Sequence, residues 1–287
     1  MQIGIVGLGL IGGSLGLEFV RQGHQVWGVS RQPQTCQQAE ARHVVHKAST
    51  DLFSLAIPTL DIVFVCTPIG LTLPTIEQLS QILLPSVVIT DVASVKGAIV
   101  PLASQLWPLF VGGHPMAGTE QQGIQAAQMD LFQNRAYVLT PLPTTPPSAV
   151  DCLAGLISHL GSRLVVCDPF SHDAAVAQIS HLPVMLSACL LSSAQGMPEE
   201  RRKLAQQLAS SGFRDTSRVG GGNPELGLAM AQYNQPALLA ALRDYQTHLQ
   251  YLTTCLEQGE WGSLSDLLTS AQQSRPDWID PHKGKES

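Results

Sequence analysis

Three glycines, Gly7, Gly9 and Gly12, stand between an apolar run and a helical segment, and they constrain this chain more than any other feature. Residues 3–6 have the pattern of a buried strand, and residues 10–22 that of the helix after it. A Gly-x-Gly-x-x-Gly turn uses glycine for the tight reversal and for close packing of helix on strand. The chain should therefore begin with the first strand and helix of a parallel β-α-β unit.

Further β-branched runs continue this pattern up to about residue 167. The expected strands are 3–6, 25–30, 61–66, 87–91, 110–113, 136–140 and 163–167, and the expected helices are 10–22, 33–42, 70–82, 95–107, 120–128 and 147–160. Several strands are apolar almost throughout, which is typical of strands covered on both faces. The alternation predicts an α/β, Rossmann-type, doubly wound parallel sheet.

The pattern changes after Asp168-Pro169, where helical periodicity takes over and no convincing strand follows. We therefore expect two domains: 1–167, with the sheet, and 168–287, all helical. The last residues, 275–287, are polar, and we expect them to be disordered.

Composition excludes several classes of protein. Charged residues make up 13% of the 287 residues, the net charge is −6 and the mean hydropathy is +0.13. These values argue against general disorder and against a nucleic-acid-binding protein. The six cysteines are scattered without metal-type spacing, and we expect free thiols and no bound metal. No stretch approaches about 18 uninterrupted apolar residues, so a soluble, cytoplasmic protein without a membrane span is expected.

The glycine turn also indicates a ligand. In such a turn the backbone approaches a pyrophosphate, and the free N–H groups of the helix start, here at Leu10, Ile11 and Gly12, bind its oxygens. The turn therefore predicts a dinucleotide cofactor, held by Gly7, Gly9, Leu10, Ile11 and Gly12.

The end of the second strand bears on which dinucleotide is bound. An NAD site usually has Asp or Glu there, whereas this chain has Ser30-Arg31-Gln32, with Thr35 close by. Arg31 can pair with a 2′-phosphate and Ser30 can donate to it, so NADP is the expected cofactor. The alternative is that Arg31 is an ordinary solvated charge.

Two further features follow later strands. Thr67-Pro68 ends a buried strand at the edge where cofactors bind, although a simple strand stop has the same pattern. His114 lies in the glycine-rich strand end Gly112-Gly113-His114-Pro115, and histidine can accept a hydroxyl proton at neutral pH. The other eight histidines have mostly polar neighbours. Ser94 could hydrogen-bond His114 and fix its tautomer.

Five segments together resemble the prephenate/arogenate dehydrogenases, with particular likeness to the cyanobacterial arogenate dehydrogenases. They occur in the family's order and span most of the chain: Gly-Leu-Gly-Leu-Ile-Gly (7–12), Thr-Asp-Val-Ala-Ser-Val-Lys (90–96), Gly-Gly-His-Pro-Met-Ala-Gly-Thr (112–119), Ser-His-Leu-Pro (180–183) and Gly-Phe-Arg-Asp-Thr-Ser-Arg (212–218). The resemblance implies oxidative decarboxylation of a cyclohexadienol in tyrosine synthesis, and a helical domain that forms a homodimer.

The resemblance also implies roles for individual residues. The residue matching His114 accepts the hydrogen bond of the ring hydroxyl, and the one matching Ser94 supports that histidine and the nicotinamide. The residue matching Arg218 binds a substrate carboxylate, for which arginine is suited because it binds carboxylates through two hydrogen bonds. His181 begins a His-Leu-Pro turn, where a proline-induced kink could face the site; helix packing is the alternative.

One departure from the family bears on the substrate. Relatives that use prephenate commonly have a second histidine after Leu-Pro, and this chain has Val184. We therefore expect arogenate, with Val184 among the substrate-binding residues. Glu120 follows a step where the family varies, and no role is assigned to it.

Three competing functions stay open. The chain could be a prephenate dehydrogenase giving 4-hydroxyphenylpyruvate, or a β-hydroxyacid or imine dehydrogenase of similar architecture. That second class usually needs a catalytic lysine from the helical domain, where Lys203 stands in a charged helix. A non-catalytic dinucleotide-sensing module is the third, and it would have no use for His114 and Arg218.

Overall fold

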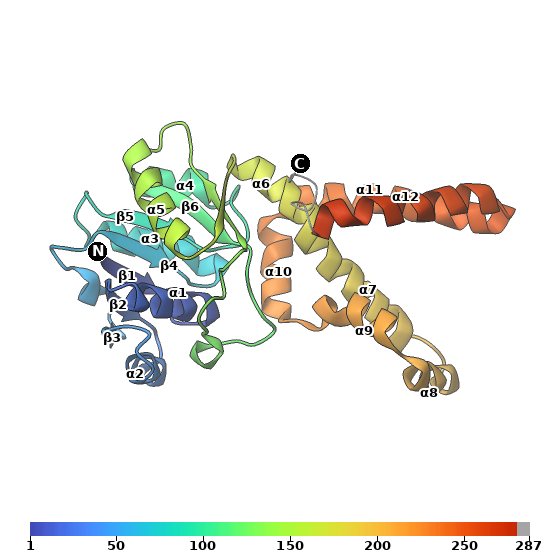
Figure 1. The fold of residues 1–287 in the computed structure, drawn as a ribbon, viewed down its shortest axis with the longest axis horizontal. Helices are drawn as coiled ribbons and strands as arrows, with labels where there is room; N and C mark the ends of the chain where they lie inside the picture. Colours follow the sequence, from blue (N-terminus) through green and yellow to red (C-terminus); the bar gives the residue numbers. More distant parts are fainter. Residues whose placement is uncertain (280–287) are drawn as a thin grey trace, which may run out of the picture. The chain divides into compact units, whose positions relative to one another are not determined.

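The computed structural model describes residues 1–279, and its first part is an eight-stranded sheet with helices on both faces (Figure 1). In chain order the strands are β1 (Gln2–Val6), β2 (Gln25–Val29), β3 (Lys47–Ser49), β4 (Ile62–Val65), β5 (Val88–Asp91), β6 (Phe110–Pro115), β7 (Ala136–Thr140) and β8 (Arg163–Val166). Their order across the sheet is β3-β2-β1-β4-β5-β6-β7-β8. The predicted Rossmann-type α/β class is confirmed.

The helices of this part are α1 (Leu10–Arg21), α2 (Pro33–Ala41), η1 (Leu52–Leu55), α3 (Ile69–Ser80), α4 (Val100–Leu106), η2 (Ile124–Ala126) and α5 (Pro147–His159). They enclose two hydrophobic cores, one on each side of the sheet. Within β4, Ile62 and Phe64 belong to one core, and Val63 and Val65 to the other. Because successive side chains of a strand point to opposite faces, this explains why the strand is apolar at every position.

Beyond residue 167 the described part of the chain contains only helices and turns. These are α6 (Pro169–Val176), the π-helical turn η3 (Ala177–His181), α7 (Leu182–Gln195), α8 (Glu199–Leu208), α9 (Ser211–Ser217), η4 (Arg218–Gly221), α10 (Pro224–Tyr233), α11 (Gln235–Gln258) and α12 (Trp261–Ile279). By its packing, Met1–Leu238 forms one compact unit and a second begins at Leu239. The predicted division after residue 167 stays a prediction.

Several details differ from the sequence-based expectation. The sheet is not wholly parallel, because β7 runs antiparallel to β6, and the short β3 was not predicted. The expected helix over 120–128 was wrong: Gly123 has φ +76° and only the three residues of η2 are helical. The expected helix over 95–107 begins only at Val100 and ends at Leu106; before it lies a loop in which the N–H groups of Lys96 and Gly97 donate to Asp173.

The expected disorder of the tail was also wrong where it can be judged. Helix α12 runs to Ile279 and so includes the first residues of the segment 275–287. The remainder, 280–287, lies outside the described residues.

The break after the sheet is marked by a helix start. The Asp168 carboxylate accepts hydrogen bonds from the N–H groups of Phe170 and Ser171, 3.0 Å each, and Pro169 occupies the first turn of α6. A hydrogen bond with the Ser171 side chain, together with these backbone hydrogen bonds, lowers the pKa of Asp168. The change of pattern at Asp168-Pro169 therefore has a direct structural cause.

The helical stretch Pro169–Gln195 is continuous through α6, η3 and α7, and it was not predicted as a unit. Its 27 residues, with mean hydropathy 1.7 in an 18-residue window, meet a length and composition criterion for a membrane span. A core helix of a soluble protein meets the same criterion, so this is weak evidence for a span. In this stretch His172, Asp173 and His181 are buried, and their partners are described below.

Candidate active site

The glycine turn after β1 has the shape that its sequence predicts. Gly7 has φ +100°, and a Cβ there would lie 2.5 Å from the carbonyl oxygen of Cys66. A Cβ on Gly12 would lie 2.0 Å from the carbonyl oxygen of Gly7. In contrast, a Cβ on Gly9 would have nothing within 4 Å. Gly7 and Gly12 are therefore required by packing, whereas Gly9 leaves open space above the turn.

This turn provides donors for an anion. Helix α1 begins at Leu10 without a side-chain cap, so the N–H groups of Leu10, Ile11 and Gly12 have no partner among residues 1–279 and can bind an anionic ligand. Thr67 follows β4, beside the turn, and its buried hydroxyl has no partner among the described residues. The turn lies between β1 and β4, where the strand order reverses and α/β sheets bind ligands. Pro68, the residue before α3, is exposed at this edge. The site fits a pyrophosphate.

The residues at the end of β2 are close to one another. The Ser30 hydroxyl accepts a hydrogen bond from the Gln32 N–H at 3.4 Å, and the Thr35 hydroxyl donates to the Gln32 side chain at 3.2 Å. Arg31 is exposed and makes no ion pair within residues 1–279. The cation is thus available to a ligand at the position where an NAD site usually has a carboxylate.

A buried ion pair fixes the ends of β5 and β6 to each other. The Lys96 ammonium, which is fully buried, donates to the Asp91 carboxylate and to the carbonyl oxygen of Gly113, the latter at 2.6 Å. Asp91 also accepts from the N–H groups of Ala93 and Gly113, at 3.0 and 3.1 Å. Burial lowers the pKa of Lys96, and the Asp91 carboxylate opposes that shift. The residue before His114 is therefore held by both members of the pair.

His114, on β6, is 7% exposed and makes a hydrogen bond that the sequence analysis did not foresee. Its Nδ1 lies 2.8 Å from Nε2 of His172 on α6. Its Nε2 has no hydrogen-bond partner in the part of the chain that the structure describes. Burial, together with His172, Lys96 and His181 nearby, holds the pKa of His114 well below its ordinary value. A neutral imidazole with one free nitrogen can accept a proton or hydrogen bond from a ligand.

The second histidine is in turn bound by a carboxylate. Nδ1 of His172 lies 2.8 Å from Asp173 Oδ1, and the two oxygens of Asp173 accept from the N–H groups of Lys96 and Gly97, at 2.7 Å each. Asp173, His172 and His114 thus form a chain of hydrogen bonds that joins α6 to the ends of β5 and β6.

His181 is fully buried in the π-helical turn η3. The amide nitrogen of Asn234 lies 3.2 Å from its Nδ1, while its Nε2 is buried without a partner among the described residues. The turn lies next to Pro183, which has no backbone N–H and so cannot donate the hydrogen bond of a regular helix. In the turn, the Leu182 N–H donates to the carbonyl oxygen of Ala177, five residues earlier. Such π turns are frequent at functional sites.

Ser94 does not make the hydrogen bond to His114 that the sequence suggested. Its buried hydroxyl has no partner among the described residues, since Nδ1 of His114 is occupied by His172. The predicted tautomer-fixing role of Ser94 was therefore wrong in this structure. A ligand-binding role for the Ser94 hydroxyl stays a prediction.

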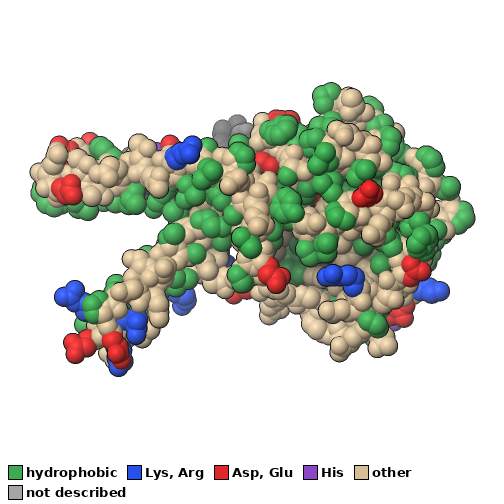
Figure 2. All heavy atoms as spheres, turned by 180° about the vertical axis from the view of Figure 1, so that it is seen from behind, with side chains coloured by type: hydrophobic (Ala, Val, Ile, Leu, Met, Phe, Trp, Pro, Cys, Tyr) green, Lys and Arg blue, Asp and Glu red, His purple; other side chains and the backbone are tan. Residues whose placement is uncertain are grey.

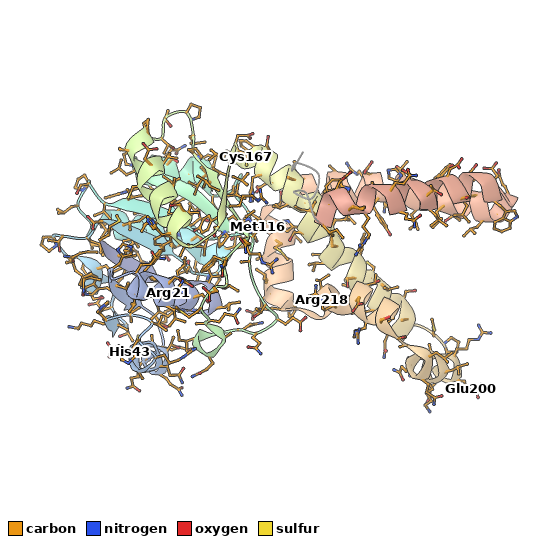
Figure 3. The ribbon with its side chains drawn as sticks, viewed as in Figure 1. Arg21, His43, Met116, Cys167, Glu200 and Arg218 are labelled. Carbon is orange, nitrogen blue, oxygen red and sulfur yellow. The ribbon has the colours of Figure 1, made fainter. Side chains whose placement is uncertain are left out.

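The remaining two predicted residues have partners of their own. Arg218, at the start of η4 (labelled in Figure 3), is exposed and pairs with Glu120 at 3.3 Å. This contact gives Glu120 a neighbour that the sequence did not indicate. Val184 is half-buried, packs against the core that includes Met230 and lies beside Gly227 on α10. A ligand role for Arg218 and Val184 stays a prediction.

Sequence reasoning missed His172, Asp173, Lys96 and Asn234. The polar sequence neighbours of the other eight histidines suggested exposed side chains, which was wrong for two of them, because His172 is 2% exposed and His181 is fully buried. A usable signal was the His172-Asp173 pair, one turn after the Asp168-Pro169 helix start. Asn234 had no comparable signal.

Comparison with known proteins shows the family. Residues 15–166 match the family described as prephenate dehydrogenase, nucleotide-binding domain, and residues 168–270 match prephenate dehydrogenase, dimerization domain. The prephenate dehydrogenase of Bacillus subtilis is 30% identical over 277 residues, which cover 94% of this chain and 74% of that protein.

Solved structures agree with this result. Arogenate dehydrogenase from Synechocystis is 52% identical, with a TM-score of 0.87, covering 97% of this chain and 100% of the other. Prephenate dehydrogenase from Aquifex aeolicus, in complex with hydroxyphenyl propionate and NAD+, has a TM-score of 0.92 at 24% identity and shares the fold, covering 96% and 98%. The chain belongs to the prephenate/arogenate dehydrogenase family of enzymes.

Proposed function

We propose that this enzyme is an NADP-dependent arogenate dehydrogenase, which converts arogenate to tyrosine by oxidative decarboxylation. The observation that carries the proposal is His114: a buried imidazole with lowered pKa and a free Nε2, at the same sheet edge as the glycine turn. The 52% identity to the Synechocystis arogenate dehydrogenase supports the choice of substrate.

The reaction removes a hydride from the ring carbon that bears the hydroxyl, while CO₂ leaves from the opposite ring carbon. The bonding pair left by CO₂ completes the aromatic ring, so atoms and electrons balance. NADP, when bound, supplies the hydride acceptor. Nε2 of His114 accepts the hydrogen bond of the ring hydroxyl and stabilises the positive charge that develops on that oxygen. Arg218 and His181 bind the anionic groups of the substrate.

The preference for NADP is supported by the end of β2. The Arg31 guanidinium is free there, and a 2′-phosphate would meet no carboxylate among Ser30, Gln32 and Thr35. Replacing Arg31 with Ala should raise KM for NADP by a factor equivalent to about 1.5–3 kcal/mol, since the lost pair is charge-assisted, with kcat retained. Equal efficiency of the wild-type enzyme with NAD and NADP would contradict the proposal.

Selectivity for arogenate follows from Val184. Prephenate has a pyruvyl side chain whose keto oxygen needs a donor, and arogenate has an ammonium that a protonated histidine would repel. Valine neither donates nor repels, and an unpaired buried acceptor costs about 1–3 kcal/mol. We expect kcat/KM to be higher for arogenate than for prephenate when formation of the reduced cofactor is followed by its absorbance at 340 nm. The substitution Val184→His should raise the turnover of prephenate. A wild-type preference for prephenate would refute the proposal.

Prephenate dehydrogenase activity is the second candidate, since the Bacillus subtilis relative is named for it. A β-hydroxyacid or imine dehydrogenase has less support, because Lys203, the lysine that such an enzyme of this architecture would need, is exposed on α8 and pairs with Glu199. A dinucleotide-sensing module would have no use for the hydrogen-bonded chain from Asp173 to His114.

We further propose that the enzyme is a cytoplasmic homodimer formed through its helices. Among residues 1–279, helix α12 has no buried residue, although it carries Trp261, Leu268 and Trp278, each 60–72% exposed. Figure 2 shows hydrophobic side chains gathered along the helices. Exposed apolar surface of this kind is typical of an interface, and the matched family domain is described as a dimerization domain. Sedimentation as a monomer at micromolar concentration would contradict it.

A further inference from the structure

The strongest unexplained feature is that the two buried histidines of the site have different partners on Nδ1. Nδ1 of His114 contacts another histidine, whereas Nδ1 of His181 contacts an amide. A neutral imidazole has one donor and one acceptor nitrogen, so the partner of Nδ1 decides what Nε2 can do. The positions of the ring hydrogens follow from neighbouring groups that can only accept a hydrogen bond.

For His114 the fixed group is the carboxylate of Asp173. A carboxylate can only accept, and Asp173 already accepts from two backbone N–H groups, so the proton between Asp173 and His172 lies on Nδ1 of His172. We assign His172 this one proton, so its Nε2 is an acceptor and Nδ1 of His114, 2.8 Å away, donates. The lone pair of His114 is thereby left on Nε2.

For His181 the fixed group is the backbone carbonyl of Asp173. The Asn234 side chain lies 2.9 Å from this oxygen, which can only accept, so the atom facing it is the NH₂ nitrogen. The second hydrogen of the same nitrogen points to Nδ1 of His181 at 3.2 Å. Nδ1 of His181 therefore accepts, and the proton of its ring is on the buried, unpartnered Nε2.

We propose that His172, Asp173 and Asn234 are positioning residues that hold His114 and His181 in opposite tautomers, His114 as an acceptor and His181 as a donor. Asp173 serves both, through its carboxylate and its carbonyl oxygen. This assignment rests on the proposed function in one respect: the acceptor suits the ring hydroxyl of the substrate, and the donor suits one of its carboxylate or carbonyl oxygens.

Burial keeps both rings neutral, which the assignment requires. The pKa values of His114 and His181 are lowered by desolvation, and for His114 the nearby His172, Lys96 and His181 add to the effect. The Asp173 carboxylate opposes the shift of His181. Between pH 7 and 8 each of the two rings therefore carries a single proton.

The direct test is nitrogen NMR of the full-length protein labelled with ¹⁵N-histidine, which distinguishes protonated from bare ring nitrogens. We expect a proton on Nδ1 of His114 and a bare Nε2, with the reverse in His181; His114→Ala and His181→Ala assign the signals by their loss. A proton on Nε2 of His114, as an imidazolium at His172 would impose, overturns the proposal. So does a bare Nε2 in His181.

A kinetic arm uses two replacements of His172. His172→Gln keeps an oxygen that can accept from Nδ1 of His114, whereas His172→Phe does not. We expect His172→Phe to lower kcat about 10–100-fold, with KM for NADP unchanged within about two-fold, and His172→Gln to recover most of the loss. Equal kcat in the two variants would contradict the positioning role.

The two arms separate failure of the inference from failure of the proposed function. The NMR result on the wild-type protein requires neither turnover nor a correctly folded variant at position 172. Opposite tautomers without turnover of arogenate would leave the inference standing and reject the function. Turnover of arogenate by a protein with other tautomers would reject the inference and leave the proposed function standing.

Discussion

The turn after β1 and the histidine chain between β6 and α6 lie at the same edge of the sheet, but they are built in opposite ways. At Gly7–Gly12 the ligand site is made of backbone, and its key property is that side chains are missing. From His114 to Asp173 the site is made of side chains that contact one another at 2.8 Å, and the backbone N–H of Lys96 donates to Asp173 at 2.7 Å.

This difference has consequences for what each region tolerates. The turn depends on close backbone contacts between Gly7, Gly12 and the residues that follow β4, so its substitutions act within this small region. The histidine chain depends on three segments remaining in register: the loop at Lys96, strand β6 and helix α6. Changes at any of the three should reach His114.

The largest effect on stability is expected at Lys96. Lys96→Met leaves the Asp91 carboxylate buried without its counter-charge, which should lower the free energy of unfolding by about 3–5 kcal/mol. Lys203→Met, the matched control at an exposed pair, should change it by less than about 1 kcal/mol. Urea denaturation of both variants measures the contrast; similar losses would mean that the buried pair does not brace the site.

Arg218, an exposed cation paired with Glu120, tests the proposed binding of the substrate carboxylate. Arg218→Ala should lower kcat/KM for arogenate by a factor equivalent to about 1.5–3 kcal/mol, because a substrate carboxylate loses its charged partner. The control is Arg214→Ala on the neighbouring α9, where the arginine pairs with Asp215 and should be dispensable. If NADP binding collapsed while KM for arogenate stayed constant, Arg218 would belong to the cofactor site.

Substitutions at Gly12 and Gly9 test separately the packing of the turn and the approach of the cofactor to it. Gly12→Ala places a methyl group against the Gly7 carbonyl and should lower the free energy of unfolding by about 1–3 kcal/mol. Gly9→Ala has open space, so its melting temperature should match the wild type while NADP binds more weakly. A Gly9→Ala protein with normal NADP affinity would show that no ligand approaches this position.

The last prediction concerns pH. Because the folded-state pKa values of His114 and His181 lie below their ordinary value of 6.5, the unfolded chain binds protons that the folded one does not. Their contribution is therefore complete above about pH 6.5 and is lost as pH falls toward the folded-state pKa values, by at most about 1.4 kcal/mol per pH unit for each histidine. Unfolding free energies at pH 7, 6 and 5 test this; equal values would show that these rings are not held neutral.

The comparison also explains how far sequence reasoning reached. The turn could be predicted in detail, because Gly7, Gly9 and Gly12 form one short motif in the sequence, although the contact of Gly7 with Cys66 could not be seen there. His114 was found from its glycine-rich strand end, but its partner His172 is 58 residues away and pairs with it only in the folded chain. Asn234 was out of reach for the same reason, since a buried asparagine in a helical region has no local signature.

Single-turnover hydride transfer in His114→Ala, followed at 340 nm with saturating NADP and arogenate, tests the central claim most directly. If His114 accepts the hydrogen bond of the ring hydroxyl while the glycine turn and the end of β2 hold the cofactor, the rate should fall by about 10²–10⁴ with the Kd for NADP unchanged. A rate near that of the wild-type enzyme would contradict this division of roles and remove His114 from the mechanism.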